Sequence, residues 1–403
     1  MKPIVRKISW SAAGIVLAAG LTACGGSTER EQPVPAAGDR THGSHATRAA
    51  VPLTPLREGE RFLDVTVPQP YTPAPPNDGT DDYRCFLVDP EFAERAFVTG
   101  IEFLPQNTDI VHHAVFFRVD PADVAQARTL DVDSPGDGWT CFGGSGIRAA
   151  NREAGGTTGG GDWIGAWAPG ATETVLSARA GYQMEPGSQI VMQLHYNLLA
   201  TDGKPAGPDR SGLRLRVASG DARLDPLHIT LAPGPIELPC APGESGELCD
   251  RERSMMDVRR RFGDEVAATA TQLNLACNGG RPPVAGPTQH CDIPVRKPGL
   301  VHALLGHMHL LGRAIKVELN PGTPQARTLL DVPVYNFDDQ RARVLPQSVA
   351  VKPGDKFRVT CTHDATLRAR LPELRSIKPR YVVWGDGTSD EMCLGVIAWS
   401  APS

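Results

Sequence analysis

The chain has 403 residues, enough for two ordinary domains joined by linkers. Its formal net charge of −5 gives no basic surplus, which argues against nucleic acid as a partner. The hydrophobic fraction of 40% is sufficient for folded cores, and 42 Gly and 36 Pro favour many short strands over long helices.

The N-terminus has the pattern of an export signal. Basic residues precede an apolar stretch that runs to Leu21, and small residues then precede Cys24. Residues 1–23 are therefore predicted to be a signal peptide, too short for a comfortable transmembrane helix. The run LTACG around Cys24 resembles a bacterial lipobox, in which that cysteine is acylated after cleavage. The resemblance implies an exported lipoprotein of the cell envelope, on the periplasmic face or the cell surface; a plain secretory signal is the alternative.

Residues 24–57 are rich in Gly, Ser, Pro and Ala and lack an apolar period, which predicts a flexible tether. From residue 58 onward, apolar and polar residues alternate in short runs separated by turn residues. The expected fold class is all-β, with two consecutive antiparallel, jelly-roll-like β-sandwich domains at residues 58–220 and 221–403. The predicted strands cover residues 61–67, 97–103, 114–119, 189–197, 213–217, 315–319, 356–362, 381–384 and 394–399.

Three histidines of the first block are candidate metal ligands. His112 and His113 are adjacent, and His195 lies in a separate predicted strand, beyond a Gly-rich segment (144–161) that we expect to be a mobile loop. Three neutral imidazoles with an open position suit copper or zinc. Neighbours on a regular strand point to opposite faces, so His112 and His113 can bind one ion only where the strand is bulged or twisted. A buried pair satisfied by hydrogen bonds is the alternative.

The second block contains one segment with clear helical periodicity, residues 254–275, which Ser254 can cap. Cysteines flank it, so we expect a disulfide-bound helical insertion at about residues 240–291. Apart from Cys24 the chain has an even set of cysteines and no C-x-x-C pair, which favours disulfides over a thiolate metal site. Short loops close at the lowest entropy cost, which favours the pairs Cys240–Cys249 and Cys277–Cys291.

Two further elements supply candidate ligands. His307 and His309 form an H-x-H pair, and because residues i and i+2 of a strand share a face, both imidazoles can bind one ion. Met392 lies in the run DEMC, and its thioether is a soft ligand that favours Cu(I). A core methionine is the alternative. Gln193 and His302 are weaker candidates for supporting contacts beside these ligands.

In this order, HH, Q-x-H-Y, H-x-H-x-x-G and D-E-M-C resemble the motifs of the copper type II, ascorbate-dependent monooxygenases. That family includes the peptidylglycine α-hydroxylating and dopamine β-monooxygenases. The resemblance runs from about Tyr83 to Trp399. It implies an enzyme with two copper ions that hydroxylates a C–H bond with O₂, taking electrons from ascorbate or another one-electron reductant.

The resemblance also assigns roles to the residues. It implies that the electron-transfer copper is held by His112, His113 and His195, and that the oxygen-binding copper of the catalytic set is held by His307, His309 and Met392. It further implies the disulfides Cys85–Cys141 and Cys361–Cys393, the second of them beside Met392. Imidazoles alone tolerate both copper oxidation states, whereas the thioether biases its site toward Cu(I).

The chain departs from the peptide-amidating member of the family at the substrate contacts. That member holds a substrate carboxylate with an Arg two residues before H-x-H and with Asn and Tyr after the Met-Cys pair. The matching residues here are Leu305, Leu394 and Val396. A glycine-extended peptide is therefore not expected, and the apolar lining favours a more hydrophobic small molecule. The aromatic segment 335–339 is interpreted as a strand edge rather than as part of the cleft.

Two other classes of protein fit part of the pattern. One is a non-catalytic copper-binding lipoprotein for capture, delivery or sensing, and the other is a surface adhesion module without redox metal. The presence of all six ligands favours the enzyme, since binding alone does not need two chemically different sites. The expected partners are a small-molecule substrate, O₂ and, through the lipid, the membrane; neither nucleic acid nor an obligate protein partner is expected.

Overall fold

The computed structural model describes residues 53–75, 80–141, 144–147, 162–168, 171–198, 201, 206–337, 339–387 and 389–402. These residues belong to one compact unit. The predicted signal peptide, Cys24, most of the tether and most of the Gly-rich segment 144–161 lie outside the described residues. Among the helices that are described, none combines the length and the apolar character needed to cross a bilayer.

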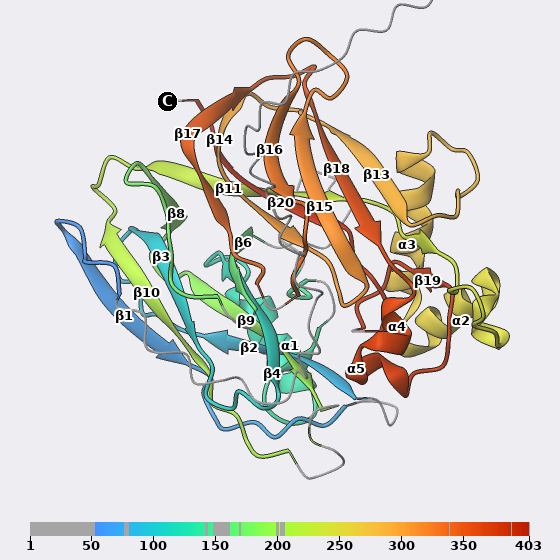
Figure 1. Cartoon of the computed structure of the whole chain (residues 1–403). Coiled ribbons are helices and arrows are strands. Elements are labelled where there is room, and N and C mark those ends of the chain that lie inside the picture. Colours follow the sequence, from blue (N-terminus) through green and yellow to red (C-terminus); the bar gives the residue numbers. More distant parts are fainter. Residues whose placement is uncertain are drawn as a thin grey trace, which may run out of the picture. The chain divides into compact units, whose positions relative to one another are not determined.

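The fold is all-β, and its strands form two sandwiches that share one long sheet (Figure 1). In spatial order the shared sheet contains β1 (Glu60–Thr66), β10 (Gly212–Ser219), β3 (Ala96–Leu104), β8 (Ala180–Met184), β11 (Asp225–Pro233), β20 (Leu394–Ser400), β14 (Gly299–His307) and β17 (Arg343–Val351), with β7 (Thr174–Val175) paired to β3. A five-stranded sheet contains β5 (Trp139–Thr140), β2 (Asp81–Val88), β9 (Gln189–Asn197), β4 (Val111–Val119) and β6 (Asp162–Trp167). A four-stranded sheet contains β13 (Thr288–Pro294), β18 (Lys356–His363), β15 (Gly312–Leu319) and β16 (Arg327–Val332), and β12 (Glu237–Leu238) pairs with β19 (Val382–Val383).

Each sandwich has its own hydrophobic core. The first core, which includes Phe116 and Leu213, lies between the five-stranded sheet and strands β3, β8 and β10. The second, which includes Ile315 and Ile397, lies between the four-stranded sheet and strands β14, β17 and β20. Strand β11 pairs in parallel with β8 on one side and antiparallel with β20 on the other, so it joins the two sandwiches. The predicted boundary near residue 220 falls in the turn between β10 and β11.

The helical insertion is present, but as two helices rather than the single one predicted over 254–275. Helix α2 (Arg251–Phe262) and helix α3 (Asp264–Cys277) are separated by Gly263. The backbone angle φ of Gly263 is +88°, a value that residues with a side chain rarely adopt. The sequence pattern of apolar residues continues across Gly263, which is why it predicted one helix. The shorter helices are α1 (Val124–Asp133), the 3₁₀ turn η3 (Glu247–Cys249), α4 (Leu367–Arg370) and α5 (Pro372–Arg375).

The predicted cap of this insertion is also wrong. Asp250 caps α2 by accepting a hydrogen bond from the backbone N–H of Arg253. Ser254 is instead buried within the first turn, where its Oγ donates to the carbonyl of Tyr381 at 2.5 Å. The serine therefore attaches α2 to the segment that leads into β19.

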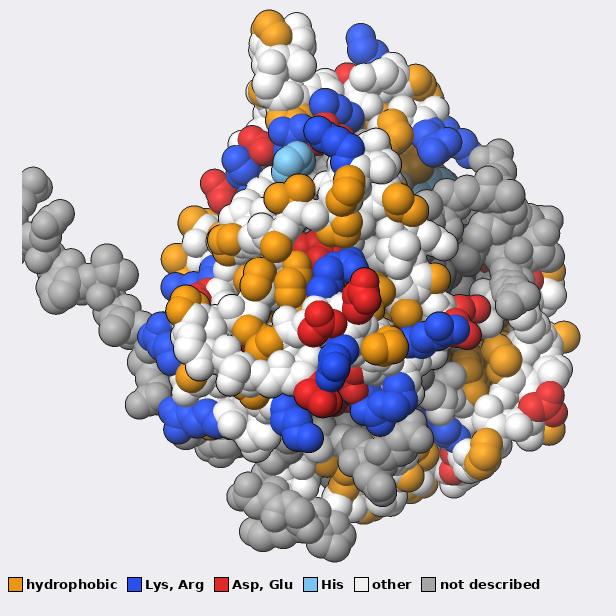
Figure 2. All heavy atoms as spheres, turned by 90° about the vertical axis from the view of Figure 1, so that its right-hand side faces the viewer, with side chains coloured by type: hydrophobic (Ala, Val, Ile, Leu, Met, Phe, Trp, Pro, Cys, Tyr) orange, Lys and Arg blue, Asp and Glu red, His pale blue; other side chains and the backbone are white. Residues whose placement is uncertain are grey.

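Figure 2 shows the face of the molecule on which α2 and α3 lie, and side chains of both charges gather there. Several of them form exposed ion pairs, among them Arg259 with Asp264 and Arg253 with Glu247. Exposed pairs of this kind contribute little to stability. The alternation of signs gives the described part of this face no uniformly charged patch.

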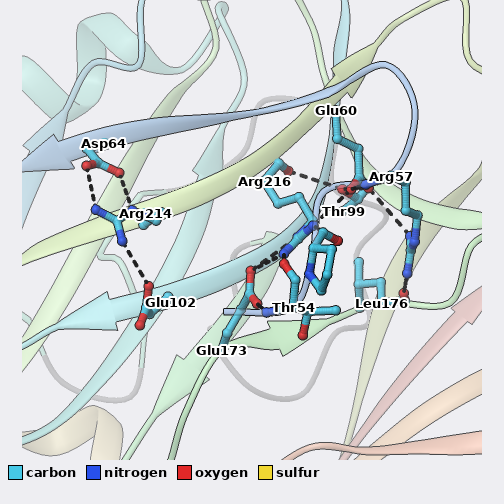
Figure 3. A network of polar contacts seen from close by, with 11 residues as sticks. Thr54, Arg57, Glu60, Asp64, Thr99, Glu102, Glu173, Leu176, Arg214 and Arg216 are labelled. Atoms are coloured by element: carbon cyan, nitrogen blue, oxygen red, sulfur yellow. Dashed lines mark hydrogen bonds and ion pairs between the residues drawn. The ribbon is translucent and has the colours of Figure 1, made fainter. Parts of the chain in front are cut away.

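A buried arginine holds the start of the first sandwich (Figure 3). The side chain of Arg216 is 0% exposed and donates to the carboxylates of Glu60 and Glu173. It also donates to the carbonyls of Thr54 and Pro55, at 2.6 and 3.0 Å. The last residues of the predicted tether are thus held against β1 and β10.

We expect Arg216→Lys to lower the free energy of unfolding by about 1–3 kcal/mol, because an ammonium keeps the charge but cannot reach all the acceptors of the planar guanidinium. Chemical denaturation measures this loss. Arg214→Lys is the matched control, since Arg214 is 30% exposed and its pairing with Asp64 contributes at most about 1 kcal/mol. Equal losses in the two variants would contradict the role given to Arg216.

Candidate metal centres

The structure brings His112, His113 and His195 together. The first two lie on β4 and the third on the neighbouring strand β9. The register shifts between Val111 and His113, so β4 is bulged at His112, which meets the condition under which both histidines can bind one ion. Nδ1 of His195 lies 3.1 Å from Nδ1 of His112 and 3.1 Å from Nδ1 of His113. Three ring nitrogens therefore converge on one point, as metal ligands must.

A carboxylate outside the predicted set orients His195. Nε2 of His195 lies 2.8 Å from Oδ1 of Asp81, which also accepts from Nδ2 of Asn197. A carboxylate at Nε2 favours the tautomer protonated there, which leaves Nδ1 with its lone pair. Tyr83 stacks on the His195 ring with 4.0 Å between centroids. Sequence reasoning missed both contacts. The pairing of β2 with β9 would have revealed them, because its register places Asp81 opposite Asn197 and Tyr83 opposite His195.

We expect Asp81→Asn to weaken copper binding at the three-histidine set by about 10–100-fold, the usual cost of losing an outer partner of a ligating histidine. Competition with a copper chelator measures the affinity. Asp64→Asn is the control, because Asp64 is exposed and pairs with Arg214 far from any histidine in sequence. An unchanged affinity in Asp81→Asn would show that the carboxylate does not orient the ring.

His307 and His309 do not lie on one strand as predicted. Strand β14 ends at His307, and His309 belongs to the loop that follows. The two rings still approach to 5.2 Å between centroids. Nδ1 of His307 lies 2.6 Å from Oε1 of Gln340, and Nδ1 of His309 lies 3.1 Å from the carbonyl of Asp390. Both oxygens are acceptors, so each ring carries its proton on Nδ1 and keeps a lone pair on Nε2.

Met392 lines the same cavity as His307 and His309. The residue before it fixes its position, because the side chain of Glu391 accepts from the backbone N–H groups of His309 and Leu311, at 2.9 and 2.6 Å. The Met392 segment and the loop that carries His309 are therefore bound to each other directly. Sequence reasoning missed Glu391 and Gln340 as supports of this set.

The helical insertion holds the Met392 segment from its other side. Arg261 of α2 donates to both carboxylate oxygens of Asp390, each at 2.6 Å. Arg261 also bonds Asp257, which in turn pairs with Arg380. The carbonyl of Asp390 accepts a hydrogen bond from the His309 ring. Asp390 therefore links the Arg261 guanidinium to the second histidine set.

The two sets face one cavity, called the central cleft below, which has a volume of about 370 Å³ and is lined by His113, His307, His309 and Met392 among others. The rings of His113 and His307 are 5.9 Å apart between centroids. Phe337 stacks on His112 at 4.8 Å and lies 6.5 Å from His309. Residues 335–337 are in a loop, so the strand edge expected there is wrong.

Enclosure by protein favours the neutral form of His113, His307 and His309. Burial lowers the pKa of His113 well below its ordinary value, and the neighbouring His195 and His112 lower it further. Burial, with His309 adding to it, lowers the pKa of His307 to about 3, and burial also lowers the pKa of His309. Neutral imidazole is the form that binds metal. In the same cleft, burial and the charge of Asp390 raise the pKa of Asp386 to about 7.

The weaker candidates have other contacts. Gln193 lines the central cleft, and its Nε2 donates to the carbonyl of Gly144 at 3.0 Å. His302 bonds Oγ of Ser400 at 2.8 Å and lies roughly 16 Å before His307 along β14. The four disulfides are the pairs that the sequence predicted: Cys85–Cys141, Cys240–Cys249, Cys277–Cys291 and Cys361–Cys393.

The fold and the site together define a β-sandwich protein with two imidazole-rich ligand sets at one cleft. Residues 287–401, which carry His307, His309 and Met392, match the family described as copper type II ascorbate-dependent monooxygenase, C-terminal domain. The match over this part of the chain confirms the family predicted from the sequence motifs.

A human protein provisionally named DBH-like monooxygenase protein 2 is 35% identical over 95 residues, which are 23% of this chain and 17% of that protein. The match thus spans less than a fifth of the relative's length. Among solved structures, the chain is similar to an allantoicase (10% identity, 85% of this chain and 90% of that one, TM-score 0.18) and a Paenibacillus xanthan lyase (9% identity, 81% and 23%, TM-score 0.20). Similarity at these scores assigns neither a fold nor a function.

Proposed function

We propose that the chain is a copper-dependent monooxygenase that hydroxylates a C–H bond of a small molecule, using O₂ and an external one-electron reductant such as ascorbate. The observation that carries the proposal is the meeting of two chemically different ligand sets at one cleft, three imidazoles in the first and two imidazoles with a thioether in the second. In the overall reaction, one oxygen atom enters the product as a hydroxyl group. The other leaves as water, with two electrons from the reductant and two protons.

The donor atoms fit copper. In the first set three Nδ1 atoms converge, and neutral imidazoles can share only one proton between any two of them. A bound cation therefore accounts for the convergence better than hydrogen bonds do. In the second set Gln340 and Asp390 occupy the Nδ1 sides of the rings, which leaves Nε2 of each ring for a metal beside the soft sulfur of Met392.

When bound, copper would supply O₂ binding and one-electron redox chemistry. The chain's own residues orient the ligand side chains and enclose the site. Asp81, Gln340 and the Asp390 carbonyl fix three imidazole rings, and Glu391 holds the Met392 segment against His309. The 5.9 Å separation of the His113 and His307 rings supports electron transfer between the sets over a short path.

Copper analysis and oxygen uptake test the proposal. The purified protein should bind two copper ions, with two distinct Cu(II) signals in electron paramagnetic resonance. Its O₂ consumption should require both a reductant and a substrate. Two bound coppers without O₂ consumption, across several reductants and a broad small-molecule library, would favour the non-catalytic copper-binding lipoprotein instead.

We also propose that the protein is exported and anchored through a lipid on Cys24. The four disulfides support this location, because such bonds persist in oxidising compartments. Cys24→Ser should therefore move the protein from the membrane fraction to the soluble fraction of a producing bacterium, as followed by cell fractionation and immunoblotting. Retention of the variant in salt-washed membranes would count against the lipid anchor.

A further inference from the structure

One wall of the central cleft is apolar next to the second ligand set. Leu305 lies two residues before His307 on β14, and Leu394 lies two residues after Met392. Side chains two apart on a strand share a face, so Leu305 opens into the cleft beside the His307 ring. Leu231 of β11 and Trp163 of β6 extend this wall from the shared sheet and the first sandwich.

The apolar wall continues past the cleft. A second hollow, of about 60 Å³, shares Trp163, Ala166, Trp167 and Leu305 with it. Beyond these residues the hollow is lined by groups such as Phe103 and Val396. None of its described lining residues is Asp, Glu, Lys, Arg or His. The described wall beside the second ligand set is therefore backed by a space that offers a hydrocarbon group no charge.

The central cleft itself has no described lining residue that is Lys or Arg. Its acidic lining residues are Glu265, which is exposed on α3, and Asp386. Arg261 is not among the described residues that line the cleft, and its guanidinium is bound to Asp390 and Asp257. In the copper-free protein, an anion entering the cleft would lose its hydration without gaining a cationic partner from these described walls.

We infer that the substrate is a small, largely apolar molecule without negative charge, bound with its hydrocarbon part against Leu305, Leu394 and Trp163. This inference rests on the proposed function and adds the chemical class of the substrate. The volume of about 370 Å³ lies at the lower end of small-molecule sites, which fits a compact ligand rather than a polymer. Leu305 and Leu394 are then the residues that determine specificity.

Binding of matched probes tests the inference without depending on turnover. The probes are 4-phenylbutanamide, its isosteric anion 4-phenylbutanoate, and amides with shorter and longer chains between ring and amide. Calorimetry on the copper-free and the copper-loaded protein gives the dissociation constants. We expect the amide to bind the copper-free protein at least about tenfold tighter than the anion. Each added methylene should tighten binding by about fourfold until the hollow is filled.

Leu305→Arg places a cation on the apolar wall and should reverse the preference, so that the carboxylate binds tighter than the amide. Leu305→Met is the matched control, since it conserves volume and charge and should keep the wild-type order. Leu231→Arg on β11, which is separated from β14 by β20, provides a second cationic variant if the first fails to fold. Circular dichroism checks the fold of each variant.

The results separate the two proposals. Binding of the anion by the wild-type protein as tightly as the amide, or no binding of any amide, overturns the substrate class while copper loading and O₂ uptake still stand. Amides that bind the copper-free protein with the expected dependence on chain length support the substrate class. If the copper-loaded protein consumes no O₂ with any reductant or any compound of the small-molecule library, the proposed function fails and the binding preference of the cleft remains.

Discussion

Replacing Met392 with Ile should abolish substrate-dependent O₂ uptake while leaving copper at the three-histidine set. Isoleucine keeps an apolar side chain of similar size but removes the thioether, a soft donor that lines the cleft together with His307 and His309. The affinity of the second set for Cu(I) should fall by more than the roughly 10–100-fold typical of losing an outer partner, because a direct ligand is lost. Copper titration under reducing conditions and oxygen-electrode measurements give the two effects.

Two further variants make the Met392 result specific. Met184→Ile changes a buried methionine in the core of the first sandwich and should cost less than about 1.5 kcal/mol with turnover retained. Met392→His restores a third ligand but a harder one, so copper should return to the second set with its preference shifted toward Cu(II). Unimpaired turnover in Met392→Ile would be decisive against the oxygenase.

Replacing Arg261 with Gln should have the second-largest effect, because it removes both ion pairs of this guanidinium at once. Asp390 is 1% exposed and would lose its two charge-assisted hydrogen bonds, which predicts a loss of about 3 kcal/mol or more in the free energy of unfolding. Copper affinity at the His307, His309 and Met392 set should fall about 10–100-fold, since the Asp390 carbonyl no longer has a fixed position beneath His309.

Arg260→Gln is the control for this prediction. Arg260 is adjacent in sequence and 72% exposed, and its pair with Asp257 should contribute at most about 1 kcal/mol. The Arg261 variant should also leave the affinity of the three-histidine set unchanged. A loss of stability with both copper affinities intact would mean that the insertion supports the fold but does not position the second set.

The sequence predicted the ligands because ligand identity is a local property. The runs around His112, His195, His307 and Met392 are each only a few residues long, and the chemistry of imidazole and thioether is the same in any fold. The strand rule also made a bulged or twisted strand the condition for His112 and His113 to bind one ion, and the register of β4 and β9 meets that condition. The resemblance implied the disulfides Cys85–Cys141 and Cys361–Cys393. Proximity along the chain favoured Cys240–Cys249 and Cys277–Cys291.

The same strand rule failed at His309. The alternation argument assumed that the strand continued, but β14 ends at His307. His309 reaches the site because Glu391 and the Asp390 carbonyl bond its backbone and its ring, contacts that span about eighty residues of sequence. The split of the helical insertion at Gly263 has a similar origin, since the apolar period of α2 and α3 does not reveal a positive φ between them.

By itself the sequence determined the all-β class, the six candidate ligands and the family of the C-terminal part. Only the tertiary structure decided that Asp81, Gln340 and Arg261 support those ligands, that His113 and His307 face one cleft, and that Leu305 opens into it. The physical reason is that alternation along a strand fixes which face a side chain occupies, whereas its partner across the sheet or the cleft depends on register and on packing between segments far apart in the chain.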